Sequence, residues 1–156
     1  MRQVTPGLAP NGGMRAVDGT PMDCRTPKAI GRDIKAGYDL LEAGNGYDNH
    51  YALAMEKPNE VVPNARIKNP KSGRALEAWS DEPGIELDSG NFLDGETPRD
   101  LGKGATGYPF RSAFCLEPSR FPDSPNHSGL PTTALKPGEW YSGTIVYRLS
   151  ADKKQA

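Results

Sequence analysis

The sequence has no long hydrophobic run, few cysteines and no excess of either charge, and each absence excludes a class of protein. No apolar run approaches the roughly 20 residues needed to span a bilayer. The net charge of -1 gives the chain no field that would recruit nucleic acid or an anionic membrane. Two cysteines are too few for a disulfide framework, so reduced thiols are expected. We therefore expect neither a membrane nor a nucleic acid as partner.

Large apolar residues are also scarce, since Leu, Ile, Val and Phe make up 26 of the 156 residues. So low a fraction would indicate disorder in a highly charged chain, but this chain is nearly neutral. We predict a single globular domain with a thin core. The 18 glycines and 15 prolines favour short strands joined by turns. The first six residues contain no apolar signal-peptide core, so a soluble, cytoplasmic protein is expected.

Turn residues place the strands. Asn11-Gly12 and Asp18-Gly19 are turn signals, and together they predict a short hairpin strand over 14–17. The turn residues of 69–73 predict a second hairpin. The further strands expected from the pattern lie at 51–55, 65–67, 74–79 and 140–149.

One segment has a helical period instead. Apolar residues recur at spacings of four, four and three between 30 and 41, which would align them on one helix face that ends near Gly44. Gly31 and Gly37 each weaken such a helix by about 1 kcal/mol. We expect at most a short helical excursion on the surface of a sheet.

Residues 102–107 spell the G-x-G-x-x-G of a phosphate-binding loop. The context that phosphate binding needs is missing, because no apolar strand precedes the glycines and Tyr108-Pro109 follows in place of a helix. We interpret the segment as a flexible loop and expect no nucleotide cofactor.

The stretch 114–126 places a single carboxylate, Glu117, at the end of an apolar run. Residues 114–116 have the pattern of a buried strand end, and the prolines that follow predict that the chain leaves the sheet directly after Glu117. Strand ends that open into ordered loops often carry function. A glutamate at a strand end is nevertheless most often a solvated charge, and periodicity alone leaves both readings open.

The sequence of this stretch resembles the signature around the catalytic glutamate of the aldose 1-epimerase (galactose mutarotase) family. Leu116-Glu117 is followed by Phe121-Pro122-Asp123-Ser124-Pro125-Asn126-His127. Further blocks that resemble the family lie at 8–25, 44–51, 72–95 and 134–147, so the resemblance spans nearly the whole chain. Two of them read Gly19-Thr20-Pro21-Met22-Asp23-Cys24-Arg25 and Gly46-Tyr47-Asp48-Asn49-His50.

The resemblance implies an all-β fold, an antiparallel β-sandwich of the galactose mutarotase-like supersandwich type, truncated to its C-terminal half. Residues 1–150 would form the C-terminal part of an aldose 1-epimerase-like domain and 151–156 a frayed tail. A split or truncated reading frame is the expected origin. Half a sandwich should leave strand edges and a sheet face exposed, so we expect self-association, or complementation by a missing N-terminal half.

The resemblance also implies roles for particular residues. Glu117 would be the catalytic base and Asp48 a hydrogen-bond acceptor that orients the sugar, with no cofactor and no metal. The family's acid histidine lies in the absent half, and a base without its acid loses a factor of roughly a hundred to ten thousand. His50 and His127 are the candidate substitutes for that acid. For His50 we favour an imidazole on a wet loop or bonded to backbone, and for His127 a structural turn.

Two functions follow as expectations. The first is an aldose 1-epimerase that interconverts the α and β anomers of an aldohexose such as glucose or galactose by acid/base ring opening, impaired in this chain. The second is a non-catalytic carbohydrate-binding or relic fragment of such an enzyme.

Overall fold

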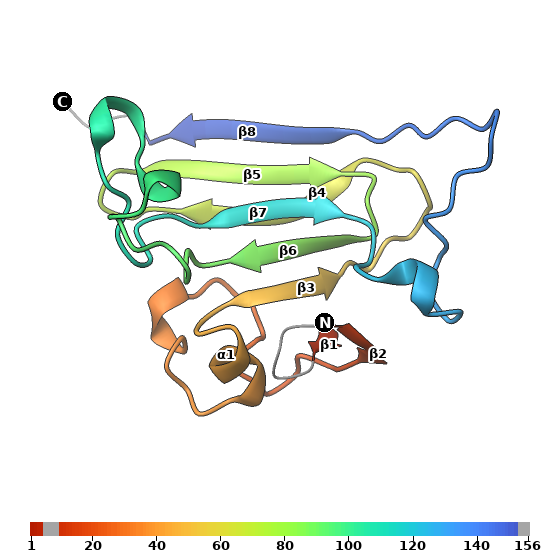
Figure 1. Ribbon diagram of the computed structural model, residues 1–156, viewed down its shortest axis with the longest axis horizontal. Helices are drawn as coiled ribbons and strands as arrows, with labels where there is room; N and C mark the ends of the chain where they lie inside the picture. The colour runs from red at the N-terminus through yellow and green to blue at the C-terminus, as the bar shows by residue number, and fades with distance from the viewer. Residues whose placement is uncertain (5–9, 153–156) are drawn as a thin grey trace. The chain divides into compact units, whose positions relative to one another are not determined.

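The computed structural model describes residues 1–4 and 10–152, which form short strands with very little helix (Figure 1). The strands are β1 (Arg2–Val4), β2 (Pro10–Met14), β3 (Asp48–Ala52), β4 (Val62–Lys68), β5 (Arg74–Ser80), β6 (Gly84–Asp88), β7 (Cys115–Ser119) and β8 (Ile145–Ala151). The helices are α1 (Asp39–Ala43) and the 3-10 turns Ile30–Arg32, Pro98–Asp100, Lys103–Ala105 and Ser124–Asn126. The predicted all-β class is confirmed.

The strands form three small sheets. Their orders are β1-β2, β3-β6-β7 and β4-β5-β8, and the paired strands of the first and third sheets are antiparallel. The chain divides into two compact units, the first Met1–Tyr51 with Glu86–Cys115 and the second Ala52–Ile85 with Leu116–Ala156. Asp48 belongs to the first unit and Glu117 to the second.

The core of the first unit is small. Its buried members are Met1, Met22, Leu40, Leu41 and Tyr47. The predicted helical excursion is confirmed, because α1 has only five residues, Gly44 caps it, and its two leucines face this core. The core is thin, as the composition predicts, because the few large apolar residues are spread over many short elements.

The predicted hairpin strand over 14–17 is wrong. β2 ends at Met14 and pairs with β1, so Asn11-Gly12 lies inside a strand rather than in a turn. The side chain of Asn11 accepts a hydrogen bond from the Gly13 amide at 2.9 Å. Such a local bond is typical of turns, but here it occurs within an irregular pair of strands. The Asp18-Gly19 turn is confirmed by the 3.0 Å bond from the Thr20 amide to the Val17 carbonyl.

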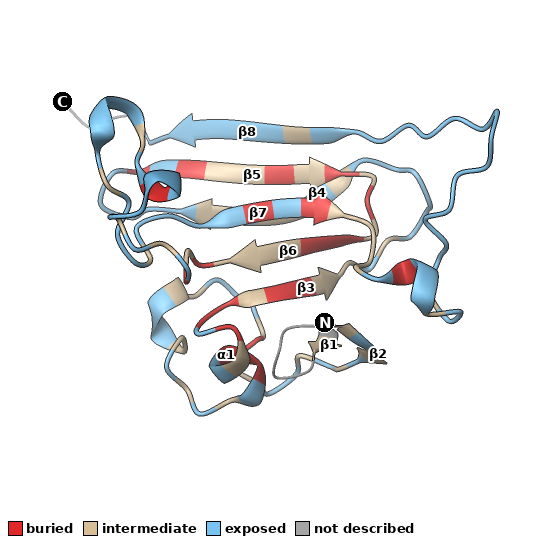
Figure 2. Ribbon diagram, viewed as in Figure 1, coloured by how far each residue is buried: buried red, intermediate tan, exposed pale blue. Residues whose placement is uncertain are grey.

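The second hairpin is confirmed. β4 and β5 pair antiparallel with Ile67 opposite Leu76, and the side chain of Asn69 accepts bonds from two amides of the connecting turn. β8 pairs with β5 but begins at Ile145, later than the predicted 140. Figure 2 shows β8 almost wholly exposed, as befits an edge strand.

Two strand boundaries differ from the prediction near the candidate residues. β3 runs from Asp48 to Ala52, whereas a strand at 51–55 was expected. β7 continues through Pro118 to Ser119, so the chain does not leave the sheet directly after Glu117. A proline is tolerated there because β7 is an edge strand of its sheet, where one side of the backbone needs no amide donor.

Three other expectations concern loops and the terminus. Residues 102–107 form a compact turn around Lys103–Ala105, with the Gly102 amide bonded to the Thr106 carbonyl at 2.8 Å. The predicted frayed tail is wrong at its first two residues, since Ala151 ends β8 and Asp152 pairs with Lys68 at 2.8 Å. Its residues 153–156 lie outside the described residues. No helix within the described ranges is long and apolar enough to cross a membrane.

Candidate functional site

Asp48 is the first residue of β3, and a tight turn after α1 delivers it there. The amide of Gly46 reaches back to the Leu41 carbonyl at 2.8 Å. A β-carbon on Gly44 would lie 2.9 Å from that of Asp48, so only glycine lets the turn pass so close to the candidate side chain. Asp48 itself is half-buried. The sequence folds this way because two glycines and Asn45, which adopts a positive φ, supply the backbone conformations of the turn.

The residue before Asp48 is held from several directions. Tyr47 is 1% exposed, and its carbonyl oxygen accepts bonds from the Ser89 amide at 2.9 Å and from the Asn91 side-chain amide at 2.7 Å. The Tyr47 amide in turn donates to the Ser89 hydroxyl at 3.1 Å. Ser89 and Asn91 are both buried. The loop after β6 therefore fixes the backbone from which the Asp48 carboxylate projects.

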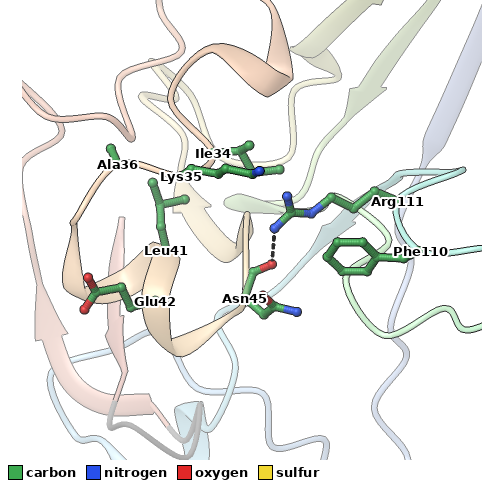
Figure 3. Close-up of a pocket in the computed structure, with 8 residues that line it drawn as sticks. All are labelled: Ile34, Lys35, Ala36, Leu41, Glu42, Asn45, Phe110 and Arg111. Atoms are coloured by element: carbon green, nitrogen blue, oxygen red, sulfur yellow. Dashed lines mark hydrogen bonds between the residues drawn. The ribbon is translucent and has the colours of Figure 1, made fainter.

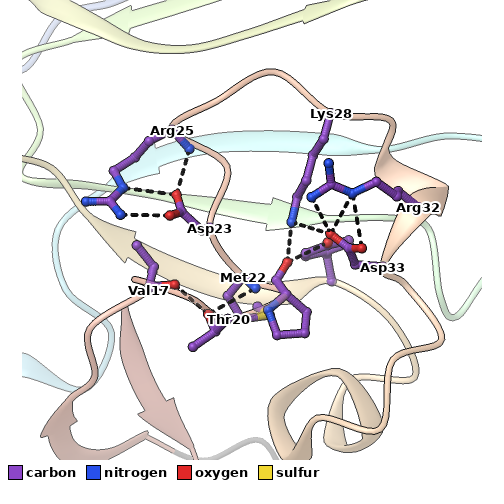
Figure 4. Close-up of polar contacts among 10 residues, drawn as sticks. Val17, Thr20, Met22, Asp23, Arg25, Lys28, Arg32 and Asp33 are labelled. Carbon is purple, nitrogen blue, oxygen red and sulfur yellow. Dashed lines mark hydrogen bonds and ion pairs between the residues drawn. The ribbon is translucent and has the colours of Figure 1, made fainter.

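The phenol of Tyr47 is held by the 17–33 loop. Its hydroxyl donates to the Pro21 carbonyl at 2.9 Å, and the Lys28 ammonium donates to the same oxygen. Lys28 is nearly buried and pairs with Asp33 at 2.8 Å, as Figure 4 shows. This is the Gly-Thr-Pro block of the sequence, so that block supports Tyr47 and, through it, Asp48.

Two carboxylates of the same loop are electrostatically stabilised (Figure 4). Hydrogen bonds from Arg32 and Lys28 lower the pKa of Asp33 to about 2. Hydrogen bonds from the side chain and amide of Arg25 lower the pKa of Asp23 to about 2. Both groups remain charged over the whole physiological range, so the loop keeps its ion pairs wherever the protein works.

Glu117 lies in the middle of β7 and is exposed. The residues on either side of it, Leu116 and Pro118, are buried, so the period of two directs Glu117 to the open face of the strand. The Tyr147 hydroxyl from β8 donates to the Leu116 carbonyl at 2.8 Å and fixes the backbone beside it. The Glu117 carboxylate has no hydrogen bond or ion pair within the described part of the chain. Its oxygens are therefore open to a hydrogen bond from a ligand.

The two histidines have different surroundings. His50 lies on β3, two residues after Asp48, so both side chains share one side of the strand. It is 4% exposed on a strand, so the wet-loop alternative for His50 is wrong, whereas the alternative of a bond to backbone stays a prediction. His127 follows the turn Ser124–Asn126, and its Nε2 lies 3.1 Å from a carboxylate oxygen of Asp123. That contact is what a structural turn would show.

A buried carboxylate that sequence reasoning did not single out lies in the second unit. Glu82 accepts a hydrogen bond from the Tyr141 hydroxyl, which raises the pKa of that phenol. Arg120 lies over the Tyr141 ring at 5.1 Å and 3.9 Å from the carboxylate of Glu82. Arg120 comes three residues after Glu117, so the cluster ties the end of β7 to the segment that precedes β8. Spacing in the sequence gives no signal for it.

Within the described residues there is no group of three His, Cys, Asp or Glu side chains that could hold a metal ion. Neither Cys24 nor Cys115 forms a disulfide bond within the described part of the chain. The sequence also did not predict that Ser89 and Asn91 hold the backbone before Asp48. Both residues nevertheless lie in the 72–95 block that resembles the family.

Comparisons with known proteins point in one direction. The family model described as aldose 1-epimerase matches residues 3–148. The chain is 36% identical over 143 residues to galactose mutarotase from Bos taurus, and the match covers 92% of this chain and 39% of that protein. It is 32% identical over 151 residues to aldose 1-epimerase from Escherichia coli, with 96% of this chain and 42% of that protein covered.

A solved structure agrees with the sequence comparisons. A GalM/aldose epimerase homologue from C. elegans superposes with a TM-score of 0.76 at 25% identity. The match covers 97% of this chain and 43% of the other. The chain thus spans about two fifths of the length of the relatives that it matches.

Proposed function

The chain belongs to the aldose 1-epimerase family, and we propose that it contributes the base and a sugar-orienting carboxylate to the interconversion of the α and β anomers of an aldohexose. The observation that carries this proposal is the position of Glu117. Its carboxylate is exposed and without a partner in the described part of the chain, while both neighbouring side chains are buried. The substrate class, an aldohexose such as glucose or galactose, is part of the proposal and is supported by the names of the relatives.

The chemistry requires a base and an acid. Glu117 accepts the proton of the anomeric hydroxyl while an acid protonates the ring oxygen, and the C1–O5 bond breaks to give the open-chain aldehyde. Rotation about the C1–C2 bond followed by the reverse proton transfers closes the ring as the other anomer. Asp48 accepts a hydrogen bond from a sugar hydroxyl and limits how the ring can turn. No atom is gained or lost, so the step needs no co-reactant.

The general acid would have to be one of the two histidines of this chain, and neither is well placed for that role. His50 shares a strand side with Asp48, and His127 is engaged by Asp123. We propose His50 as the better candidate of the two because it follows Asp48 on the same strand. Its burial, at 4% exposed, favours a second candidate function, in which the chain binds sugar without turning it over.

A polypeptide partner is also part of the proposal. Several large apolar side chains of the second unit are exposed, among them Trp140 at 96% and Leu149 at 82%. Exposed apolar residues beside an edge strand favour association with another chain, either a second copy or a chain that carries the remaining part of the family's domain. A sedimentation experiment that finds a single monomeric species at all concentrations would contradict self-association. We also propose a cytoplasmic location, in keeping with a sequence that has only two cysteines.

The binding half of this proposal is tested by titrating the protein with D-galactose and following its amide resonances by NMR. Asp48→Asn should weaken binding roughly tenfold, since a hydrogen bond to a charged acceptor is worth about 1.5 to 3 kcal/mol. Asp39→Asn is the matched control, because the Asp39 side chain is 61% exposed in the same unit and pairs with Arg15. Equal affinities for the two variants would remove Asp48 from the site.

A further inference from the structure

The first unit contains an open pocket of about 280 Å³ that the proposed chemistry does not use. Figure 3 shows its lining, which comes from the 34–36 segment, from α1 with the following turn, and from Phe110 and Arg111. The pocket lies beside the turn that carries Asp48: Asn45 is one of its lining residues, and the Asp48 side chain abuts Gly44.

Arg111 is held rigidly but keeps its positive charge. Its Nη2 donates to the Asn45 carbonyl at 2.5 Å and its Nε lies 3.4 Å from the Asn91 side-chain oxygen. The guanidinium also stacks 4.4 Å from the centre of the Phe110 ring. All three partners are neutral. Of the five N–H donors of a guanidinium, two are used in these bonds, so three remain for a ligand.

Lys35 supplies a second uncompensated cation to the same pocket. It makes no hydrogen bond or ion pair within the described residues, and Figure 3 shows its side chain directed toward that of Arg111. The one acid of the lining, Glu42, points away from both in this view. One of its carboxylate oxygens lies 3.8 Å from the position that a β-carbon would take on Gly37. Two cations that face one pocket while its acid is turned aside repel each other unless an anion lies between them.

We infer that this pocket binds the anionic group of a phosphorylated or carboxylated sugar between Lys35 and Arg111. An oxyanion there receives charge-assisted hydrogen bonds from the ammonium and from the free guanidinium edge, the geometry that Arg provides for phosphate and carboxylate groups. The exposed Phe110, at 49%, adds an apolar surface for the ring carbons of a sugar. The sugar part of this inference rests on the proposed function, whereas the anion part does not.

The test is a calorimetric titration of the whole chain with inorganic phosphate, glucose 6-phosphate, glucuronate and glucose. We expect phosphate to bind, and at least one of the two anionic sugars to bind more tightly than phosphate or glucose. Lys35→Gln should weaken the binding of phosphate roughly tenfold, because it removes one charged donor. Lys103→Gln is the matched control, an exposed lysine of the same unit that lies outside the pocket.

The outcomes separate the two proposals. Absence of phosphate binding, or an equal effect of Lys35→Gln and Lys103→Gln, overturns the anion site. Phosphate binding with no gain from either sugar anion overturns the sugar assignment. Tight binding of glucose 6-phosphate by a protein that does not bind galactose would support the pocket and count against galactose as the ligand of the proposed function. Arg111→Gln serves as the second variant, with the circular dichroism spectrum as the check that its bond to Asn45 is not needed for folding.

Discussion

The phenol of Tyr47 donates a hydrogen bond of 2.9 Å to the carbonyl oxygen of Pro21, two residues 26 positions apart in the chain. The bond joins the Gly-Thr-Pro block to the residue that precedes Asp48. Both segments resemble the family, and their contact gives a physical reason why they occur together. The Gly-Thr-Pro block holds the side chain of Tyr47 and so positions the segment that carries Asp48.

Tyr47→Phe removes this bond and leaves the ring in place. We expect the free energy of unfolding to fall by about 1 kcal/mol, the usual net worth of one intramolecular hydrogen bond, because Lys28 still donates to the Pro21 carbonyl. Urea unfolding followed by circular dichroism measures the change. Tyr38→Phe is the control, since the Tyr38 hydroxyl accepts only a longer bond from Arg15, at 3.3 Å. A Tyr47→Phe protein no less stable than the control would contradict the role given to the phenol.

Asn91→Ala should cost more. The substitution removes the 2.7 Å bond to the Tyr47 carbonyl and leaves buried polar groups of Ser89 and Tyr47 with fewer partners, a loss of about 1 to 3 kcal/mol. Because the backbone before Asp48 loosens, the affinity for galactose should fall as well. Asn126→Ala, in an exposed turn, is the comparison for both measurements. Unchanged sugar affinity in a folded Asn91→Ala protein would show that Asp48 does not depend on this support.

Gly46→Ala tests the turn itself. Gly46 has a φ of +137°, and an added β-carbon would lie 2.2 Å from the side-chain oxygen of Asn91. We expect destabilisation of roughly 1 to 3 kcal/mol or more, because the backbone strain and the steric clash add together. At Gly129 an added β-carbon meets nothing within 4 Å, so Gly129→Ala should change the melting temperature little. Equal melting temperatures for the two variants would contradict the description of the turn.

Acid should loosen the 17–33 loop within a defined range of pH. The folded pKa values of Asp23 and Asp33, both about 2, lie below the ordinary value of 3.8. Their contribution to stability is therefore fully present above pH 4 and is lost as the pH falls from about 4 towards 2. Asp33→Asn should remove part of this dependence while leaving stability near pH 7 lower than that of the parent. Melting temperatures measured at intervals from pH 7 to pH 2 test the prediction, and a flat profile below pH 4 would refute it.

Much of the local structure follows from short-range chemistry. The turn at 69–73 is correctly predicted because Asn69 bonds to its own neighbours, and α1 is short because Gly37 and Gly44 flank it. The position of β2 could not be predicted, because its partner β1 is a strand of only three residues with no distinctive pattern. Pro118 misled the prediction for β7, since a proline marks the end of a strand only where both edges are paired.

Some of the candidate residues can also be recognised from local sequence, whereas others come together only in the folded protein. Glu117 and Asp48 are recognisable because they stand in distinctive stretches of sequence. Ser89 and Asn91, which hold the backbone before Asp48, lie 42 and 44 residues from Tyr47, and no local pattern reports a contact at that separation. Arg111 and Lys35 likewise become a pair only in the folded unit.

The central claim, that Glu117 is the base of an aldose 1-epimerase site, is tested most directly by polarimetry. Pure α-D-galactose is dissolved with and without the protein, and the approach of the optical rotation to equilibrium is followed. We predict acceleration by the parent chain, a loss of at least roughly a hundredfold in Glu117→Gln, and no loss in Glu60→Gln, an exposed glutamate of the same unit. A rate above the spontaneous one that survives Glu117→Gln would contradict the claim, and a folded protein that binds galactose without any acceleration would establish the non-catalytic alternative.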